Sequence, residues 1–316
     1  MFFGNGVPAS VFIYSRCDIG MDDAGGSWVT KISLSCFAFS YAIAMILEIS
    51  RLFFRAPIRF LIIVGITIAG IFAHTVYLWL KFQKDFSGGT PMSSWYDWCL
   101  MVSLAVATTY AIIAIRKNEN SIGIFFLPLI LLLIIVALFV KNQDPFTPSA
   151  ATNIWAITHG VTLLLGTSSM IIAFVAGVMY LVHAFRLKKK LPPRIGFRLP
   201  SLEWLERCNR ISLFYATGLI AAGLVSGAIM NILRSTENLS GIPWNDSVVV
   251  SSGVLLLWLI TVTIFEAFYK PARQGRKIAY LTLASFVFLA MVLVFVFMAE
   301  HAASNEQVSW IREALL

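Results

Sequence analysis

Residues 122–140 read IGIFFLPLILLLIIVALFV, an apolar run without a single charged side chain. A helix needs about 20 predominantly apolar residues to cross the hydrocarbon core of a bilayer. Lipid offers no hydrogen-bond partner to backbone N–H and C=O groups, so such a run must satisfy them internally as a helix. The stretch therefore predicts a membrane-spanning helix.

The rest of the chain contains further runs of the same kind. Hydrophobic residues make up 59% of the 316 positions and charged residues 13%. A soluble domain averages about 45–50% apolar and about 25% charged residues. We therefore expect an all-α protein, a polytopic transmembrane helix bundle of about eight spans in a lipid bilayer. The predicted spans are 31–51, 57–80, 97–115, 121–140, 155–185, 211–233, 247–269 and 277–299.

The basic residues predict the orientation of these spans. If the spans alternate in direction, most of the 24 lysines and arginines fall in connections on one side, at 51–59, 116–117, 186–210 and 270–277. Cytoplasmic loops carry this excess of positive charge. We therefore predict that both ends of the chain lie on the outer side (N-out, C-out). The net charge of +8 is explained by this orientation, and no nucleic-acid partner is expected.

Several kinds of site are not indicated by the sequence. The four cysteines show no CxxC spacing, so neither a zinc site nor a thiol–disulfide exchange site is expected. The missing CxxCH motif means that the chain is not itself a c-type cytochrome. No catalytic triad, phosphate loop or metalloprotease pattern occurs. The amphipathic stretch 202–211 is expected to lie along the inner interface, ahead of the sixth span.

The four histidines are the most informative polar residues, because imidazole ligates haem iron. In the predicted topology His159 and His301 both lie at the outer side, at the start of the fifth span and just past the eighth. His183 lies at the inner end of the fifth span, where its ring is expected to extend toward the headgroups, and His74 lies inside the second. Two histidines at one depth could clamp a planar cofactor. Interfacial histidines without a ligand role are the alternative.

Tryptophans accompany the outer histidines. Trp155 precedes His159 by one helical turn and shares its face of the helix. Trp244 and Asp246 lie in the connection between the sixth and seventh spans, on the same side. An indole ring offers a flat apolar surface for a macrocycle and an N–H donor. Tryptophans also gather at membrane interfaces as an aromatic belt, so this alternative stays open.

From about residue 150 to its end, the chain resembles the CcsA/HemX-like cytochrome c assembly family, haem-handling integral membrane proteins of system II cytochrome c biogenesis. The resemblance divides the chain into 1–150, an outer segment with four transmembrane helices, and 151–316, the family-like four-helix region. The segments that carry it are WAITH (155–159), LEWLER (202–207), GLIAAGLVSG (218–227), the Trp244 loop, the span around Trp258, and GRKIAY (275–280) leading toward His301.

The resemblance implies a haem site on the outer, periplasmic face of a bacterial cytoplasmic membrane. His159 and His301 match the two external histidines that would be axial ligands of the iron. Trp244 and Asp246, with Trp155 nearby, match part of a tryptophan-rich haem platform. The cofactor would be b-type haem in transit to apocytochrome c, with a CcsB/ResB-like membrane protein as partner. Whether the chain is an enzyme, as a haem lyase or synthetase component, is left open.

The sequence also departs from the family pattern. The platform here has one tryptophan and one aspartate, so a HemX-like accessory or regulatory protein without haem-attachment activity is the alternative function, ahead of a small-solute transporter. Some relatives carry an intramembrane histidine eight residues after the tryptophan of the seventh span. Counting from Trp258, this chain has Glu266 there, so a second haem site is not expected. We predict that Glu266 pairs with Lys270.

The remaining polar and small residues inside the spans predict packing. His74 is either a haem ligand on an entry path or a neutral imidazole bonded to a neighbouring helix. Glu48 is expected to pair with Arg51. Small residues allow helix backbones to approach closely. We therefore expect the fifth and sixth spans to dock at the centre of the bundle through Gly160, Gly166, Gly177, Gly223 and Gly227.

Overall fold

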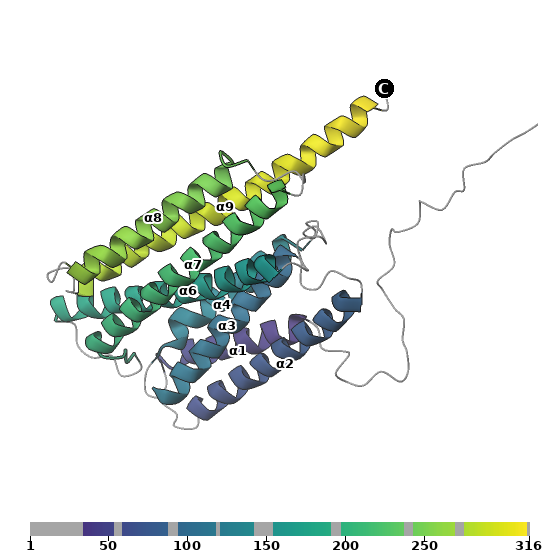
Figure 1. The fold of residues 1–316 in the computed structure, drawn as a ribbon. Helices are drawn as coiled ribbons and strands as arrows, with labels where there is room; N and C mark the ends of the chain where they lie inside the picture. The colour runs from purple at the N-terminus through teal and green to yellow at the C-terminus, as the bar shows by residue number, and fades with distance from the viewer. Residues whose placement is uncertain are drawn as a thin grey trace, which may run out of the picture.

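The structure is a computed structural model (Figure 1) that describes residues 34–53, 59–87, 94–117, 121–141, 154–190, 197–236, 243–268 and 275–314. Within these ranges the backbone alone is described at 86–87, 234–236, 275 and 297–314. The predicted outer segment at the start of the chain lies outside the described residues.

The described residues form helices and no strand, and each of the eight predicted spans is found as a helix. Six of the helices, α2, α3, α6, α7, α8 and α9, are long and apolar enough to cross a membrane, and α1 and α4 are shorter apolar helices of 17 residues. The helices are α1 (Leu34–Ser50), α2 (Arg59–Ser87), α3 (Trp95–Arg116), α4 (Gly123–Phe139), α6 (Ile154–Lys188), α7 (Leu202–Thr236), α8 (Ser247–Phe268) and α9 (Gly275–Ala314).

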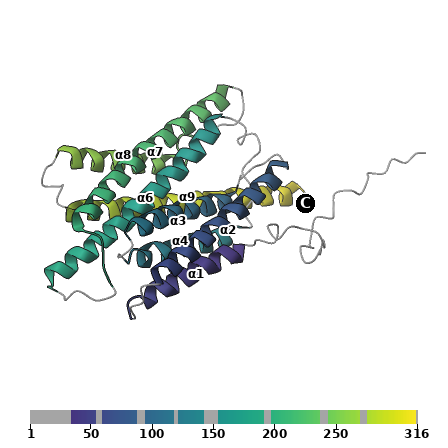
Figure 2. The same ribbon diagram turned by 90° about the horizontal axis from the view of Figure 1, so that it is seen from below.

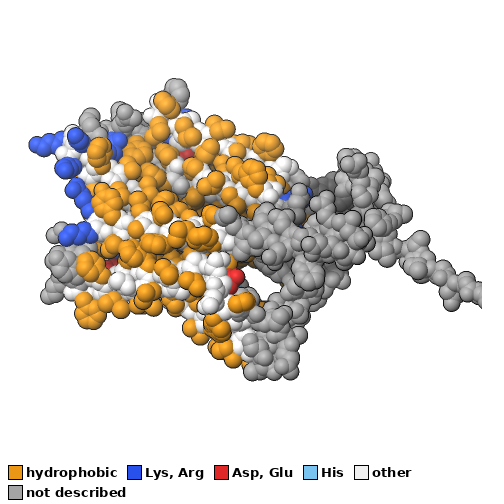
Figure 3. Space-filling view, turned by 90° about the horizontal axis from the view of Figure 1, so that it is seen from above, with side chains coloured by type: hydrophobic (Ala, Val, Ile, Leu, Met, Phe, Trp, Pro, Cys, Tyr) orange, Lys and Arg blue, Asp and Glu red, His pale blue; other side chains and the backbone are white. Residues whose placement is uncertain are grey.

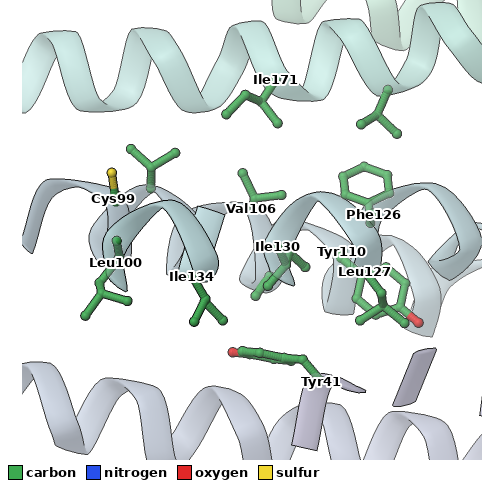
Figure 4. Close-up of a cluster of buried hydrophobic side chains, with 14 of the residues drawn as sticks. Tyr41, Cys99, Leu100, Val106, Tyr110, Phe126, Leu127, Ile130, Ile134 and Ile171 are labelled. Carbon is green, nitrogen blue, oxygen red and sulfur yellow. The ribbon is translucent and has the colours of Figure 1, made fainter. Parts of the chain in front are cut away.

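Helix α6 lies between two groups of helices, α1 to α4 on one side and α7 to α9 on the other (Figure 1). Two clusters of buried apolar side chains follow this arrangement. In the first, Tyr41 of α1 and Ile171 of α6 lie on opposite sides of the side chains of α3 and α4 (Figure 4). The second joins α6 through Met170 to α7, α8 and α9. Helix α6 therefore contributes to both cores.

The outer surface of the bundle is apolar over its body and basic at one end (Figure 3). Such large exposed apolar surface is explained by contact with lipid. We call the two ends of the bundle the basic end and the histidine end. The histidine end is where α6 begins and α7 finishes, and it contains His159. The basic end is formed by Arg51, Arg116, Lys117, Lys188, Lys189 and Lys190.

Two helices extend further than the sequence predicts. The stretch 202–211 is the beginning of α7 and not a separate interfacial helix. Leu205 and Asn209 in this stretch are buried, and Asn209 accepts a hydrogen bond of 2.8 Å from Thr282 of α9, so packing within the bundle holds it. Helix α9 continues past 299, so that His301 lies inside the helix and not beyond it.

Candidate functional site

The imidazole of His159 lies between α6 and α7 at the histidine end. His159 is in the second turn of α6, half-buried, and its Nδ1 is 2.7 Å from the backbone carbonyl oxygen of Gly223 in α7. A carbonyl oxygen can only accept, so Nδ1 carries the proton and donates. In the neutral imidazole, the other ring nitrogen, Nε2, then holds the lone pair. This is the tautomer in which a histidine binds a metal ion through Nε2.

Glycines in α7 provide the space for this ring. A Cβ atom added to Gly227 would lie 2.8 Å from Nδ1 and 2.9 Å from Cε1 of His159. Farther along the same interface, a Cβ on Gly223 would lie 2.6 Å from Leu163, and a Cβ on Gly166 2.9 Å from Ile220. The predicted docking of the fifth and sixth spans is thus confirmed, and the two helices run side by side (Figure 2).

Two of the glycines assigned to this interface behave differently. Gly160 has nothing within 4 Å of an added Cβ, so the prediction that it allows a close approach is wrong. Gly177 faces Asn209 of α7 at 3.4 Å but also Leu283 and the carbonyl of Ala279 in α9. It therefore serves the junction of three helices rather than one pair.

The Gly223 carbonyl receives a second side-chain donor. The hydroxyl of Ser226, three residues later in α7, donates to the same oxygen over 2.8 Å. A carbonyl oxygen has two lone pairs and accepts more than one hydrogen bond. The sequence did not predict either contact. Every residue has a backbone carbonyl, so no residue type indicates which carbonyl accepts a hydrogen bond.

The predicted tryptophan platform is divided between helix α6 and the turn before α8. Trp155 precedes His159 by one turn and is 37% exposed. Trp244 is 55% exposed and lies in the turn before α8. Asp246 follows in this turn, and its carboxylate accepts the backbone N–H of Val248 over 2.8 Å. This is the bond of a helix N-cap, so Asp246 has a structural task at the start of α8.

The second predicted iron ligand, His301, lies in α9, but its side chain is outside the described part of the chain. Helix α9 packs against α6, the helix that carries His159. The predicted pairing of the two imidazoles therefore stays a prediction.

His74 is not near His159. It is fully buried in α2, and its ring stacks on Phe37 of α1 with ring centres 4.1 Å apart and an angle of 3° between the planes. Its Nδ1 lies 3.4 Å from the hydroxyl of Tyr41, also in α1. Its Nε2 has no hydrogen-bond partner among the described residues. These contacts agree with the predicted alternative of an imidazole bonded to a neighbouring helix.

His183 lies near the basic end. Its Nδ1 donates to the carbonyl oxygen of Pro200 over 3.1 Å, and the side chain is half-buried. This acceptor was not foreseen in the sequence, and the expectation that the ring extends toward the headgroups stays a prediction. The segment before α7 folds back onto α6 and supplies an acceptor there.

Comparison with known proteins places the chain in a family. The family model described as "Cytochrome C assembly protein" matches residues 92–301, from just before α3 into α9. The chain belongs to this cytochrome c assembly family. A curated relative is the cytochrome c biogenesis protein CcsA of Guillardia theta, 21% identical over 243 residues, which cover 71% of this chain and 78% of the relative. No solved structure matches the chain.

The family match has two consequences for the site. This cytochrome c assembly protein is an integral membrane protein of cytochrome c biogenesis, as its family and the six long apolar helices among its described residues show. The matched region includes His159 and reaches His301. It also begins earlier than the resemblance seen in the sequence, so that α3 and α4 belong to it.

The described residues of this family member contain no group of three or more histidine, cysteine, aspartate or glutamate side chains that could hold a metal ion. At His159 the described residues therefore supply one imidazole for a metal ion, from α6. Haem suits such a site, because the porphyrin itself supplies four of the iron's ligands and the protein supplies only the axial ones.

A polar cluster between α2 and α3, also toward the histidine end, was missed in the sequence. Lys81 of α2 forms ion pairs with Asp97 of α3 and, over 3.2 Å, with Asp85. Asp97 is buried and also accepts a hydrogen bond of 2.7 Å from Ser94, the N-cap residue of α3. The spacing of Ser94 and Asp97 at a helix start was the available signal. The cluster ties α2 to α3 with its polar atoms satisfied.

The predicted pairs of the intramembrane glutamates have different outcomes. Glu48 pairs with Arg51 over 3.7 Å, as predicted. Glu266 pairs with Arg210 of α7 over 3.8 Å. Lys270, its predicted partner, lies outside the described residues. The sequence did not predict the pair with Arg210, because the spacing within one helix gives no information about residues on another helix.

Proposed function

We propose that this protein holds haem on the outer face of the membrane for cytochrome c maturation, with His159 as an axial ligand of the iron. The observation that carries the proposal is the hydrogen bond from His159 Nδ1 to the Gly223 carbonyl. A ligating histidine usually donates its second ring nitrogen to a carbonyl or carboxylate in this way. His183 makes a similar bond to the carbonyl of Pro200, and His159 differs from it in lying at the histidine end with Trp155 one turn away.

The surroundings of His159 fit a porphyrin. Trp155 lies one turn away on the same face of α6 and is partly exposed, so an indole surface is available beside the ligand. Trp244 offers a second exposed indole at the start of α8. We assign these two tryptophans, with Asp246, to the haem platform.

We assign the second axial position to His301. It lies in α9, which packs on α6, and two histidines from two helices give a bis-histidine site. The haem would be b-type and in transit, because family membership places the chain in cytochrome c assembly. When bound, haem would supply the groups that react with the thiols of apocytochrome c, and His159 and His301 would hold and orient it.

The proposal includes an orientation and a partner. The basic end is assigned to the cytoplasm by the positive-inside rule, so that the histidine end faces outward, in a bacterial cytoplasmic membrane into the periplasm. Among the residues that the structure describes, no large domain lies at the histidine end. A CcsB/ResB-like membrane protein is proposed to supply it and to receive apocytochrome c.

The test is the haem spectrum of the purified protein. The wild type is expected to carry haem with a low-spin bis-histidine spectrum. His159→Ala and His301→Ala should each lose this spectrum and regain it with added imidazole, which takes the vacant axial position. His183→Ala, a histidine of the same helix near the other end, is the control and should behave as the wild type. The proposal is wrong if the double variant at 159 and 301 binds haem with an unchanged spectrum.

One observation favours a second function, a HemX-like accessory role without haem attachment. Asp246 is engaged as the cap of α8, so the platform here has little beyond its two tryptophans to hold a propionate or guide an apocytochrome. Cells that lack this protein but keep normal levels of c-type cytochromes would favour the accessory role. Loss of holocytochrome c would favour attachment.

A further inference from the structure

We propose that α7 positions the His159 ligand through Gly223 and Gly227, and that Ser226 adjusts its strength. This inference rests on the proposed haem function and adds residues to it that do not touch the iron. The three residues lie in one short stretch, GLVSG at 223–227, directly opposite the ring.

The carbonyl of Gly223 fixes the protonation of the ring. Because His159 Nδ1 donates to it over 2.7 Å, the proton is held on the side of the ring that faces α7. Nε2 then has its lone pair on the opposite side of the ring. In a free imidazole either nitrogen can carry the proton. The contact with α7 therefore selects the tautomer that can bind iron through Nε2 before haem arrives.

Gly227 provides the space for the ring in this position. A single methyl group at 227 would lie 2.8 Å from Nδ1 and 2.9 Å from Cε1, closer than carbon atoms approach in proteins. Relief would require the ring to rotate or α6 to move away from α7. Either movement lengthens the bond to Gly223 and redirects Nε2. Glycine at 227 is therefore a requirement of the ligand geometry in addition to helix packing.

Ser226 shares the same acceptor. Its hydroxyl donates to the Gly223 oxygen over 2.8 Å, so the oxygen is divided between Ser226 and His159. A histidine that donates a stronger hydrogen bond is a more basic ligand and favours ferric iron. Removal of the serine hydroxyl should strengthen the hydrogen bond from His159 to the Gly223 oxygen, because that oxygen then accepts one side-chain donor instead of two. The reduction potential of bound haem should then fall.

The experiment compares alanine substitutions at glycines of the same two helices in the full-length purified protein. Gly227→Ala is the test variant. Gly160→Ala, next to His159 in α6, and Gly218→Ala, in α7, are controls because neither glycine has an atom within 4 Å of an added Cβ. We expect Gly227→Ala to lose the low-spin spectrum and to regain it with imidazole. Both controls should keep the wild-type spectrum and haem content.

Ser226→Ala provides a second readout that does not depend on tolerance of a larger side chain. We expect it to keep the low-spin spectrum and to show a lower reduction potential in a redox titration. If the wild type binds no haem, or if His159→Ala leaves the spectrum unchanged, the proposed function fails. If the wild type and His159→Ala behave as proposed, a wild-type spectrum in Gly227→Ala overturns the positioning role of Gly227. An unchanged reduction potential in Ser226→Ala overturns the role of Ser226. This second test can be read even if the Gly227→Ala protein does not reach the membrane.

Discussion

The Nδ1 atom of His159 is hydrogen-bonded to the backbone carbonyl oxygen of Gly223 over 2.7 Å. The two residues are 64 positions apart in the sequence and lie on α6 and α7, the two helices that make the most extensive contact in the described part of the bundle. The orientation of this imidazole is thereby coupled to the packing of the two helices. Changes in that packing should affect haem binding, and changes elsewhere in the bundle should not.

Gly166→Ala tests the packing of α6 on α7 away from the ring. The new methyl group would lie 2.9 Å from the side chain and 3.2 Å from the backbone nitrogen of Ile220, so a helix must shift. Overpacking of this kind costs about 1–3 kcal/mol. We expect a lower midpoint of thermal unfolding in detergent, with Gly218→Ala unchanged or slightly more stable. Equal midpoints for the two variants would show that the interface accommodates the methyl group.

Asp97→Asn tests the polar cluster at the histidine end. The amide keeps the size of the side chain but removes its charge from the buried pair with Lys81. We expect a loss of about 1–3 kcal/mol in the free energy of unfolding, because Lys81 loses its buried partner and keeps only the more exposed Asp85. Lys81→Met and the double variant complete a thermodynamic cycle. Additive effects in this cycle would contradict a direct interaction.

Asp246→Ala separates the two roles given to this aspartate. Loss of the N-cap bond to Val248 should destabilise α8 by about 1 kcal/mol, whereas Asn caps a helix as well as Asp does. We therefore expect Asp246→Asn to retain the wild-type melting midpoint and Asp246→Ala to lower it. If the asparagine variant is stable but binds less haem, the carboxylate acts in the platform as well.

His74→Phe tests the structural interpretation of this buried histidine. Phenylalanine can keep the stack on Phe37 and removes the Nε2 atom that has no hydrogen-bond partner among the described residues. We expect an unchanged haem-to-protein ratio and a free energy of unfolding within about 1 kcal/mol of the wild type, because Tyr41 loses a partner while a buried polar atom is removed. A lower haem content would make His74 a ligand instead.

The sequence predicted the helix bundle well, because a long apolar run must form a helix in lipid to satisfy its backbone hydrogen bonds. It predicted the close approach of α6 and α7 from glycine spacing, since small residues have a direct steric meaning. The prediction failed at residues 202–211, because an amphipathic pattern is typical both of an interfacial helix and of the beginning of a helix that packs in the bundle. Burial of Asn209 against Thr282 of α9 decides between an interfacial helix and the start of a span, and that partner lies 73 positions away.

The candidate site was predicted only in part. Topology placed His159 at the start of the fifth span, and the structure has it in the second turn of α6. The acceptor of its ring proton is a main-chain oxygen, which no side-chain pattern reveals. The cap role of Asp246 was hidden by the resemblance to a haem platform, although an aspartate directly before a helix is also typical of an N-cap.

The most direct test of the central claim is whether Nε2 of residue 159 is bonded to haem iron. We would record electron paramagnetic resonance spectra of the ferric wild type, of His159→Gly, and of His159→Gly with ¹⁵N-labelled imidazole. The account predicts that the low-spin signal is lost in the glycine variant and returns with the ¹⁵N coupling of the added ring. A glycine variant that keeps the wild-type low-spin signal without imidazole would contradict it.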